Sequence, residues 1–282
     1  MQQIGHIQQL WRYPVKGLAG ESVQSTPCGP QGIAGDRAWA IWDVRRKEIQ
    51  SCKFRPELLR CRASYRDEVG SPLEIAFPEG SIRSSSDPAI HEAFSDLVGH
   101  PSELKSLPSA DALDFFRRYR KEGHDWLSEL RETFTRLPGE SLPEFLKTPD
   151  EVAEFVGLPG TFFLVAPLHI VTSATMSYLK ELHPESDWDI RRFRPNIVIE
   201  TDTGEGLLEQ GWLGRKIMVN GLELNCIDTA VRCGAVTRPL EELPRDASML
   251  RSIVKDADQN LGIYAETQGE TTIQVGDSVY LR

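Results

Sequence analysis

Residues 216–238 read KIMVNGLELNCIDTAVRCGAVTR, and they hold the clearest local structural signal in the chain. Asn220-Gly221 is typical of a two-residue type I′ turn, and the residues on either side of it alternate between apolar and polar. Alternation with period two places Cys226 on the apolar face, so we expect this side chain to point into a core. The stretch therefore predicts a β-hairpin over residues 216–227 and a fold built on sheets.

Beyond this hairpin the chain leaves regular pairing and reaches Cys233, which stands between Arg232 and Gly234. A thiol is a nucleophile or a soft-metal ligand only as thiolate, and an adjacent guanidinium and a loop position both favour that form. Cys233 is therefore a candidate reactive centre at the rim of a sheet, where rigid strands position functional loops. The tripeptide alone favours the plainer alternative, because an unpaired cysteine is more often an inert, small apolar residue.

Length and charge exclude several classes of protein. The chain has 282 residues, enough for one large domain or two closely joined ones, and its formal net charge is -10. A general nucleic-acid binder or a binder of anionic membranes would need a basic face. The five cysteines form no C-x-x-C pair, so neither a disulfide framework nor a zinc or iron–sulfur site of ordinary spacing is indicated. No signal-like start and no long uncharged apolar window occurs, which predicts a cytoplasmic protein without a membrane partner.

The first hundred or so residues have the pattern of a β-rich domain. Short apolar runs alternate with turn signals about every ten residues, which favours a barrel or sandwich over alternating βαβ units. Residues 89–98 then have the spacing of a short helix, and residues 110–156 are charged and helical in pattern. The strands expected in this half are 4–13, 38–42, 48–50, 59–65 and 73–77.

The second half returns to strands. We expect one strand over Gly160–Val165 and another that leads into a helix near Thr172 and Ser173. Capping that helix is the favoured role of both hydroxyls, although a helix amino terminus also offers N–H groups to an anion. The other expected elements are a strand over 197–199, a helix capped by Asp246, and closing strands over 261–267 and 271–281.

Three basic residues stand at turns or strand rims rather than on open faces. Lys16 lies at the tip of a proline-containing turn, and Arg37 stands where a glycine-rich loop enters a strand. Arg194 precedes Pro195, which is expected to hold it extended at the rim of a sheet with Asn196 close by. Such a guanidinium suits a phosphate or a pterin edge. The alternatives are a solvated loop lysine for Lys16 and a rim salt bridge for Arg194.

Two further features have plain alternatives. His169 could be a ligand, a base or a satisfied core residue, and the last is favoured because no acid or second histidine stands at useful spacing. The basic run over residues 53–56 is explained equally well by a cluster of surface charges.

Several separated stretches together resemble the MOSC-domain family. This group includes the carboxyl-terminal domain of molybdenum cofactor sulfurases, bacterial YcbX-like proteins and the mitochondrial amidoxime-reducing component. The resemblance implies an α+β, β-rich fold, with an N-terminal β-barrel domain over 1–108, a helical connector over 109–157 and a MOSC-type β-barrel over 158–282. The stretches that carry it are Tyr13-Pro14-Val15-Lys16, Gly35-Asp36-Arg37, Phe193-Arg194-Pro195-Asn196, Arg232-Cys233 and Val275-Gly276-Asp277-Ser278-Val279.

The resemblance also implies a site for the molybdenum cofactor (Mo-molybdopterin). The cysteine matching Cys233 is the protein ligand of molybdenum in that family, and a thiolate is a soft donor suited to such a metal. Converging cations are what a buried pterin phosphate requires, because an unpaired buried anion is costly. A pyridoxal-phosphate-binding description is also compatible with the resemblance. The residues that match the family's cofactor pocket are Lys16, Arg37, Arg194, Asn196 and Arg232, and Thr172 and Ser173 fall near a further contact.

The activity implied is reduction of an N-hydroxylated or N-oxide small molecule, with electrons from a separate electron-transfer protein and the oxygen transfer carried out by the cofactor. Two alternatives stay open: a carrier or sulfur relay in which Cys233 accepts a persulfide or hands on the cofactor, and a β-barrel module for another phosphorylated ligand. Gly17 stands where the family commonly has serine, and the loop Gly234–Pro239 is shorter than in the amidoxime-reducing branch. Cofactor binding is therefore better supported than any choice of substrate.

Overall fold

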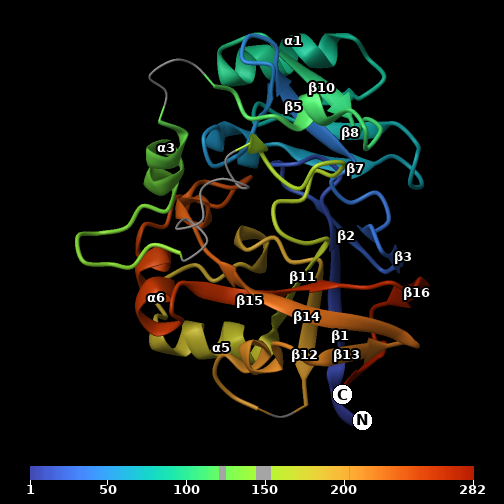
Figure 1. The fold of residues 1–282 in the computed structure, drawn as a ribbon, viewed down its shortest axis with the longest axis vertical. Coiled ribbons are helices and arrows are strands. Elements are labelled where there is room, and N and C mark those ends of the chain that lie inside the picture. Colours follow the sequence, from blue (N-terminus) through green and yellow to red (C-terminus); the bar gives the residue numbers. More distant parts are fainter. Residues whose placement is uncertain (121–124, 144–153, 203) are drawn as a thin grey trace.

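The computed structural model describes residues 1–120, 125–143, 154–202 and 204–282. Figure 1 shows one β-rich part at the top of the view and a second at the bottom, with both chain termini at the lower end. The predicted α+β, β-rich fold is thus confirmed.

The lower part is a closed barrel of seven strands. It closes because β1 pairs antiparallel with both β12 and β17. Alternate residues of the strands fill its interior, and Ile7, Ile170 and Ile263 are fully buried there. In order around the ring the strands are β1 (Gln2–Arg12), β12 (Ile197–Thr201), β11 (Leu168–Thr172), β15 (Asn260–Glu266), β14 (Leu222–Val231), β13 (Lys216–Val219) and β17 (Ser278–Leu281).

The predicted hairpin is confirmed by β13 and β14, which pair antiparallel with Val219 opposite Leu222. Asn220 has φ 45° and Gly221 has φ 79°, the two positive values that a type I′ turn requires. Cys226 is 2% exposed and lies in the barrel core, as expected.

Strand β1 joins the two parts of the chain. It lies within the residues predicted as the first domain, yet its ladders are with β12 and β17 of the barrel. A second link is β16 (Thr271–Gln274), which pairs with β3 (Ser25–Gly29). The domain boundaries at residues 108 and 158 remain predictions. Strands from residues 1–108 pair with strands from residues 158–282, so the two predicted domains share sheets.

The upper part is built on two small sheets and a helix. Its apolar core includes Leu58, Ile75 and Phe94, all fully buried. The expected strand over 59–65 begins only at Arg62, because Pro56 opens a 3-10 turn over Pro56–Arg60. One sheet contains β5 (Trp39–Asp43), β6 (Glu48–Ile49) and β10 (Ser102–Ser106), the other contains β7 (Arg62–Tyr65), β8 (Leu73–Ala76) and β9 (Ile82–Ser84), and the helix is α1 (Ala89–Val98). Two short strands lie outside these sheets: β2 (Glu21–Val23) pairs with β1, and β4 (Gly32–Ile33) pairs with β3.

Helices cover one side of the barrel. The helix α5 (Ser173–Leu182) is capped by Thr172, whose hydroxyl accepts from the N–H of Thr175. The helix α6 (Ser248–Asp256) begins beside Asp246, whose carboxylate accepts from the first N–H groups as predicted. Within the predicted connector, α2 (Leu113–Phe116) and α3 (Trp126–Thr133) are described, and residues 121–124 and 144–153 lie outside the described residues. In the part of the chain that is described, no helix is long and apolar enough to cross a membrane.

Two local predictions are wrong. Residues Gly160–Val165 form an irregular loop instead of a strand, because their apolar side chains line a cavity wall and their backbone does not enter a ladder. Arg194 has φ 56°, in the left-handed region, although a residue before proline favours an extended backbone. The turn Ile190–Arg192 ends just before it, and the left-handed residue directs the guanidinium onto the ring of Tyr13.

Candidate functional site

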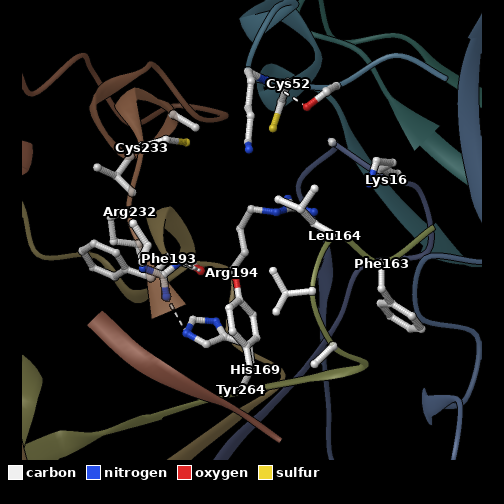
Figure 2. Close-up of a pocket in the computed structure, with 18 of the residues that line it drawn as sticks. Lys16, Cys52, Phe163, Leu164, His169, Phe193, Arg194, Arg232, Cys233 and Tyr264 are labelled. Atoms are coloured by element: carbon white, nitrogen blue, oxygen red, sulfur yellow. Dashed lines mark hydrogen bonds between the residues drawn. The ribbon is translucent and has the colours of Figure 1, made fainter. Parts of the chain in front are cut away.

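A cavity of about 220 Å³ lies against the barrel wall, beneath the upper part of the molecule. Its walls come from distant stretches of sequence: the turn after β1, the loop after β6, the loop before β11, the turn before β12, and the end of β14. Figure 2 shows side chains from these stretches pointing toward one another. Six of the predicted site residues line it: Lys16, Arg37, Arg194, Asn196, Arg232 and Cys233.

Lys16 reaches the cavity from the turn after β1. Its Nζ donates to the carbonyl of Phe162 at 2.7 Å, and no carboxylate in the described residues forms an ion pair with it. Burial, together with the charges of Lys53, Arg37 and Arg194, lowers the pKa of Lys16 to about 7. A buried ammonium group without an ion pair is costly, and a bound anion would stabilise it.

Arg37 is held by a small buried network. Its Nη1 donates to Asp36 and, at 3.3 Å, to Oδ1 of Asn196. The amide nitrogen of Asn196 donates to Asp36 at 3.1 Å, and the N–H of Tyr13 donates to the other Asp36 oxygen at 2.7 Å. Asn196 is 1% exposed and its amide is used within the protein, so it orients Arg37.

Arg194 shares an aromatic ring with Arg37. The guanidinium carbon of Arg194 lies 4.3 Å from the Tyr13 ring centroid, and that of Arg37 lies 4.9 Å from it. Arg194 donates to the carbonyl of Leu18 and has no ion pair with a described carboxylate. Burial and then the charge of Arg37 lower the pKa of Arg194. The rim salt bridge considered from the sequence is therefore not seen among the described residues.

Arg232 is buried in the cavity wall and connects two of its backbone segments. It donates to the carbonyls of Leu261 and Phe193 at 3.0 and 3.1 Å, and to Nε2 of His169. Burial, followed by the charge of Arg232, lowers the pKa of His169 well below its ordinary value, so the ring is neutral and can accept. Gly262, with φ 85°, leaves room for this imidazole, because a Cβ there would overlap it. His169 is thus a partnered buried residue, as favoured, and it also lines the cavity.

Cys233 stands two residues after the end of β14 at Val231 and directly before a 3-10 turn over Gly234–Thr237. Its side chain is half-buried and packs beside Phe134 and Leu130 of the connector. Figure 2 shows its sulfur turned toward the cavity. The thiol is therefore placed where a bound group can reach it, in contrast to Cys226, which lies on β14 with its side chain in the barrel core.

Thr172 and Ser173 are not brought to this cavity. The Thr172 hydroxyl donates to buried Glu209 at 2.6 Å while it caps α5. The Ser173 hydroxyl lies 3.4 Å from that of Thr201 and accepts from the Thr201 N–H at 3.1 Å. Thr172 thus has the capping role favoured from the sequence, whereas the Ser173 hydroxyl bonds to Thr201 of β12 and does not cap the helix.

The sequence pattern missed several lining residues. Cys52 and Lys53 come from the loop after β6, where the basic run equally resembles a surface cluster. Phe134 comes from the connector, and Tyr264 from the outer face of β15. Strict alternation along β15, with Ile263 and Ala265 in the core, is the one signal that could have placed Tyr264 outside the barrel.

Comparison with known proteins agrees with this architecture. The MOSC domain matches residues 159–280, and the MOSC N-terminal beta barrel domain matches residues 4–116. Mitochondrial amidoxime-reducing component 1 of Mus musculus is 23% identical over 305 residues, which span 100% of this chain and 83% of the relative. Molybdenum cofactor sulfurase of Danio rerio is 22% identical over 93% of this chain and 32% of its own length.

Among solved structures, the YUAD protein of Bacillus subtilis aligns with a TM-score of 0.45 and 11% sequence identity, over 99% of this chain and 95% of the other. Together the two matching domains span most of the chain, from the first strand of the barrel to the last. The chain belongs to the MOSC-domain family and carries both the MOSC N-terminal β-barrel domain and the MOSC domain.

Proposed function

We propose that this protein binds the molybdenum cofactor and reduces N-hydroxylated or N-oxide small molecules with electrons from a separate electron-transfer protein. The observation that carries the proposal is an excess of positive charge in one cavity. Lys16, Arg194 and Arg232 converge there with no ion pair to a described carboxylate, and Arg37 has only Asp36. Like charges are not gathered without compensation, because burying them costs free energy. A phosphate-bearing ligand would supply the missing negative charge.

The donor set also fits the metal end of this cofactor. Cys233 offers a thiolate, which suits a soft metal already held by sulfur atoms of an organic scaffold. Within the described residues no group of three His, Cys, Asp or Glu side chains is arranged to hold an ion alone. When bound, the cofactor would supply the oxygen-atom transfer chemistry.

The chain's own residues then have separable roles. Lys16, Arg37 and Arg194 would bind the pterin and its phosphate, and Asn196 would orient Arg37 through its hydrogen bond. Arg232 would hold the backbone on either side of the cavity, since its donors are already used by Phe193 and Leu261. Cys233 would bind the metal. Names of the relatives, an amidoxime-reducing component and a molybdenum cofactor sulfurase, support this class of cofactor.

The test is anaerobic purification followed by molybdenum and pterin analysis of the wild type and of Cys233→Ala. We expect about one molybdenum and one pterin per wild-type chain, and loss of the metal in the variant. Reduction of an N-hydroxylated nucleobase by the loaded wild type, supplied with a chemical reductant, would follow. Pterin without metal, or a persulfide on Cys233, would instead favour the carrier, and neither group would favour a module for another phosphorylated ligand.

A further inference from the structure

Tyr264 is the residue of the cavity whose position the proposed cofactor site leaves unexplained. It lies on β15 opposite His169 of β11 on one side and opposite Asp228 of β14 on the other. Residues paired across a ladder project from the same face of a sheet. Asp228, Tyr264 and His169 therefore form a row across three strands, and all three line the cavity.

The row lies on three paired strands of the barrel. Its flanking residues on β15, Ile263 and Ala265, are buried in the barrel core. The rings of His169 and Tyr264 have centroids 5.6 Å apart, and the imidazole is fixed in turn by Arg232. Figure 2 shows the phenol ring standing beside His169 with its hydroxyl pointing into the cavity. A side chain placed in this way keeps its position without a partner for its hydroxyl.

No described residue forms a hydrogen bond with the Tyr264 hydroxyl. The ionisable groups that act on this phenol electrostatically are Arg232, Arg37, Cys233 and Asp228. Burial raises the pKa of this phenol, so it stays protonated throughout the neutral range. It is thus a protonated donor whose hydroxyl points into the cavity that Cys233 also lines.

The other hydroxyls that line the cavity are Ser51 and Thr229. Both are aliphatic alcohols and far weaker acids than a phenol, whose ordinary pKa is about 10. His169 is neutral, its Nε2 accepts from Arg232, and the proton on its other ring nitrogen is used by the backbone of Arg194. Lys16 already donates to Phe162 and is needed by the anion. These comparisons leave Tyr264 as the best placed proton source on the barrel wall.

We propose that the Tyr264 hydroxyl donates a hydrogen bond to the oxygen of the N-oxygenated substrate and transfers a proton to it as the N–O bond breaks. The inference rests on the proposed function and adds a catalytic residue to it. The balance is R–NHOH + 2 e⁻ + 2 H⁺ → R–NH₂ + H₂O, with both electrons from the reduced electron-transfer protein and the oxygen leaving as water. Tyr264 supplies one of the two protons and is reprotonated from solvent at the rim, where Asp228 is exposed.

The experiment compares Tyr264→Phe with the wild type and with Tyr280→Phe, a matched change on β17 outside the cavity. All three proteins are first analysed for molybdenum and pterin, which should be equal. With an N-hydroxylated nucleobase and a chemical reductant, Tyr264→Phe should lower kcat on the order of a hundredfold, with KM changed less than about threefold. The solvent deuterium isotope effect on kcat should change in Tyr264→Phe and stay unaltered in Tyr280→Phe.

A second readout needs no turnover. Calorimetric titration of the nucleobase into the loaded, oxidised proteins should give binding about two- to tenfold weaker for Tyr264→Phe, the range for loss of one neutral hydrogen bond. Urea unfolding of the cofactor-free proteins, with a midpoint for Tyr264→Phe close to that of the wild type, shows that the phenylalanine variant is folded.

The outcomes separate this inference from the proposed function. A loaded, active wild type with Tyr264→Phe within about threefold of its kcat would overturn the role of Tyr264 and leave the proposed function standing. A loss in Tyr264→Phe that simply follows lost molybdenum would also overturn it, because the residue would then only hold the site. A wild type that carries neither metal nor pterin would defeat the proposed function itself.

Discussion

The barrel interior and the cavity beside it are lined by residues from different kinds of backbone, regular strands in one and turns and strand ends in the other. The interior is filled by alternate positions of regular strands, and Ile7, Ile170 and Ile263 are fully buried there. The cavity is lined instead by residues at turns and strand ends, and Arg37 and Arg194 both have left-handed φ values, 46° and 56°. Strained backbone of this kind costs about 1–3 kcal/mol per residue and persists only where the surroundings enforce it. The regular part therefore provides stability, and the irregular part gathers charge.

The largest contrast is expected between two cysteines of one segment. Cys233→Ala should abolish molybdenum retention while the free energy of unfolding of the cofactor-free protein changes by less than about 0.5 kcal/mol, because the half-buried sulfur is not part of the main core. Cys226→Ala should keep the metal but lose about 1 kcal/mol, because it opens space in the barrel. Metal analysis and urea unfolding measure the two effects. If both variants had the same molybdenum content and the same free energy of unfolding, Cys233 would not differ from Cys226 in the way proposed.

Gly5→Ala tests the closure of the barrel. Gly5 stands at an irregularity in the pairing of β1 with β17, and a Cβ there would overlap the carbonyl oxygen of Glu200 on β12. We expect a loss of about 3 kcal/mol in the free energy of unfolding, measured with urea, because backbone on both strands must shift. Gly221→Ala is the matched control for a positive φ, since no atom lies within 4 Å of the added Cβ. A loss in Gly5→Ala no larger than in the control would show that β1 does not close the barrel.

Arg194→Met should weaken retention of the pterin about 10- to 100-fold, the effect of removing a hydrogen bond to a charged group. Arg191→Met is the control from the same turn, because Arg191 is paired with Asp189, Glu241 and Glu242 and does not line the cavity. Pterin content after extensive dialysis is the measurement. Similar retention by the two variants would mean that the unpaired charge at Arg194 has no ligand.

The smallest effect concerns pH and the cofactor-free protein. Because the pKa of Lys16 falls from 10.5 in the unfolded chain to about 7 in the fold, the unfolded amine binds a proton between these values that the folded amine does not. The contribution of Lys16 to stability therefore rises with pH from about 7 toward 10.5, and its cost is complete below pH 7.

Lys16→Met should accordingly stabilise the cofactor-free protein by about 1–3 kcal/mol at pH 6, and by progressively less toward pH 9. Urea unfolding at several pH values measures the difference, with Lys216→Met, at the exposed first residue of β13, as the control. A difference that does not change with pH would contradict the burial of a charged amine at position 16.

The sequence was most informative where one local rule decides the structure. The turn Asn220-Gly221 has few alternatives, and alternation then placed Cys226 in the core. It failed at Gly160–Val165, because an apolar run predicts burial and leaves open whether the residues enter a ladder or wall a cavity. Arg194 shows the same limit, because a turn and the ring of Tyr13 overcome the local preference before proline.

The candidate site was predicted in part through the family resemblance, which selected Lys16, Arg37, Arg194, Arg232 and Cys233, all on the cavity wall. Local sequence could not reveal Cys52, Lys53 or Phe134, since their meeting depends on how the upper part and the connector pack on the barrel. The resemblance also pointed to Thr172 and Ser173, but the Thr172 hydroxyl caps α5 and the Ser173 hydroxyl bonds to Thr201, both away from the cavity.

The central claim is that the sulfur of Cys233 meets a metal in the cation-lined cavity. A crystal of the anaerobically loaded protein, measured on both sides of the molybdenum absorption edge, tests it most directly. We predict a single strong anomalous peak within bonding distance of Cys233 Sγ, with density for an organic anion extending from it toward Lys16 and Arg194. A molybdenum peak elsewhere on the molecule, or a loaded cavity in which Cys233 Sγ faces away from the metal, would contradict the account.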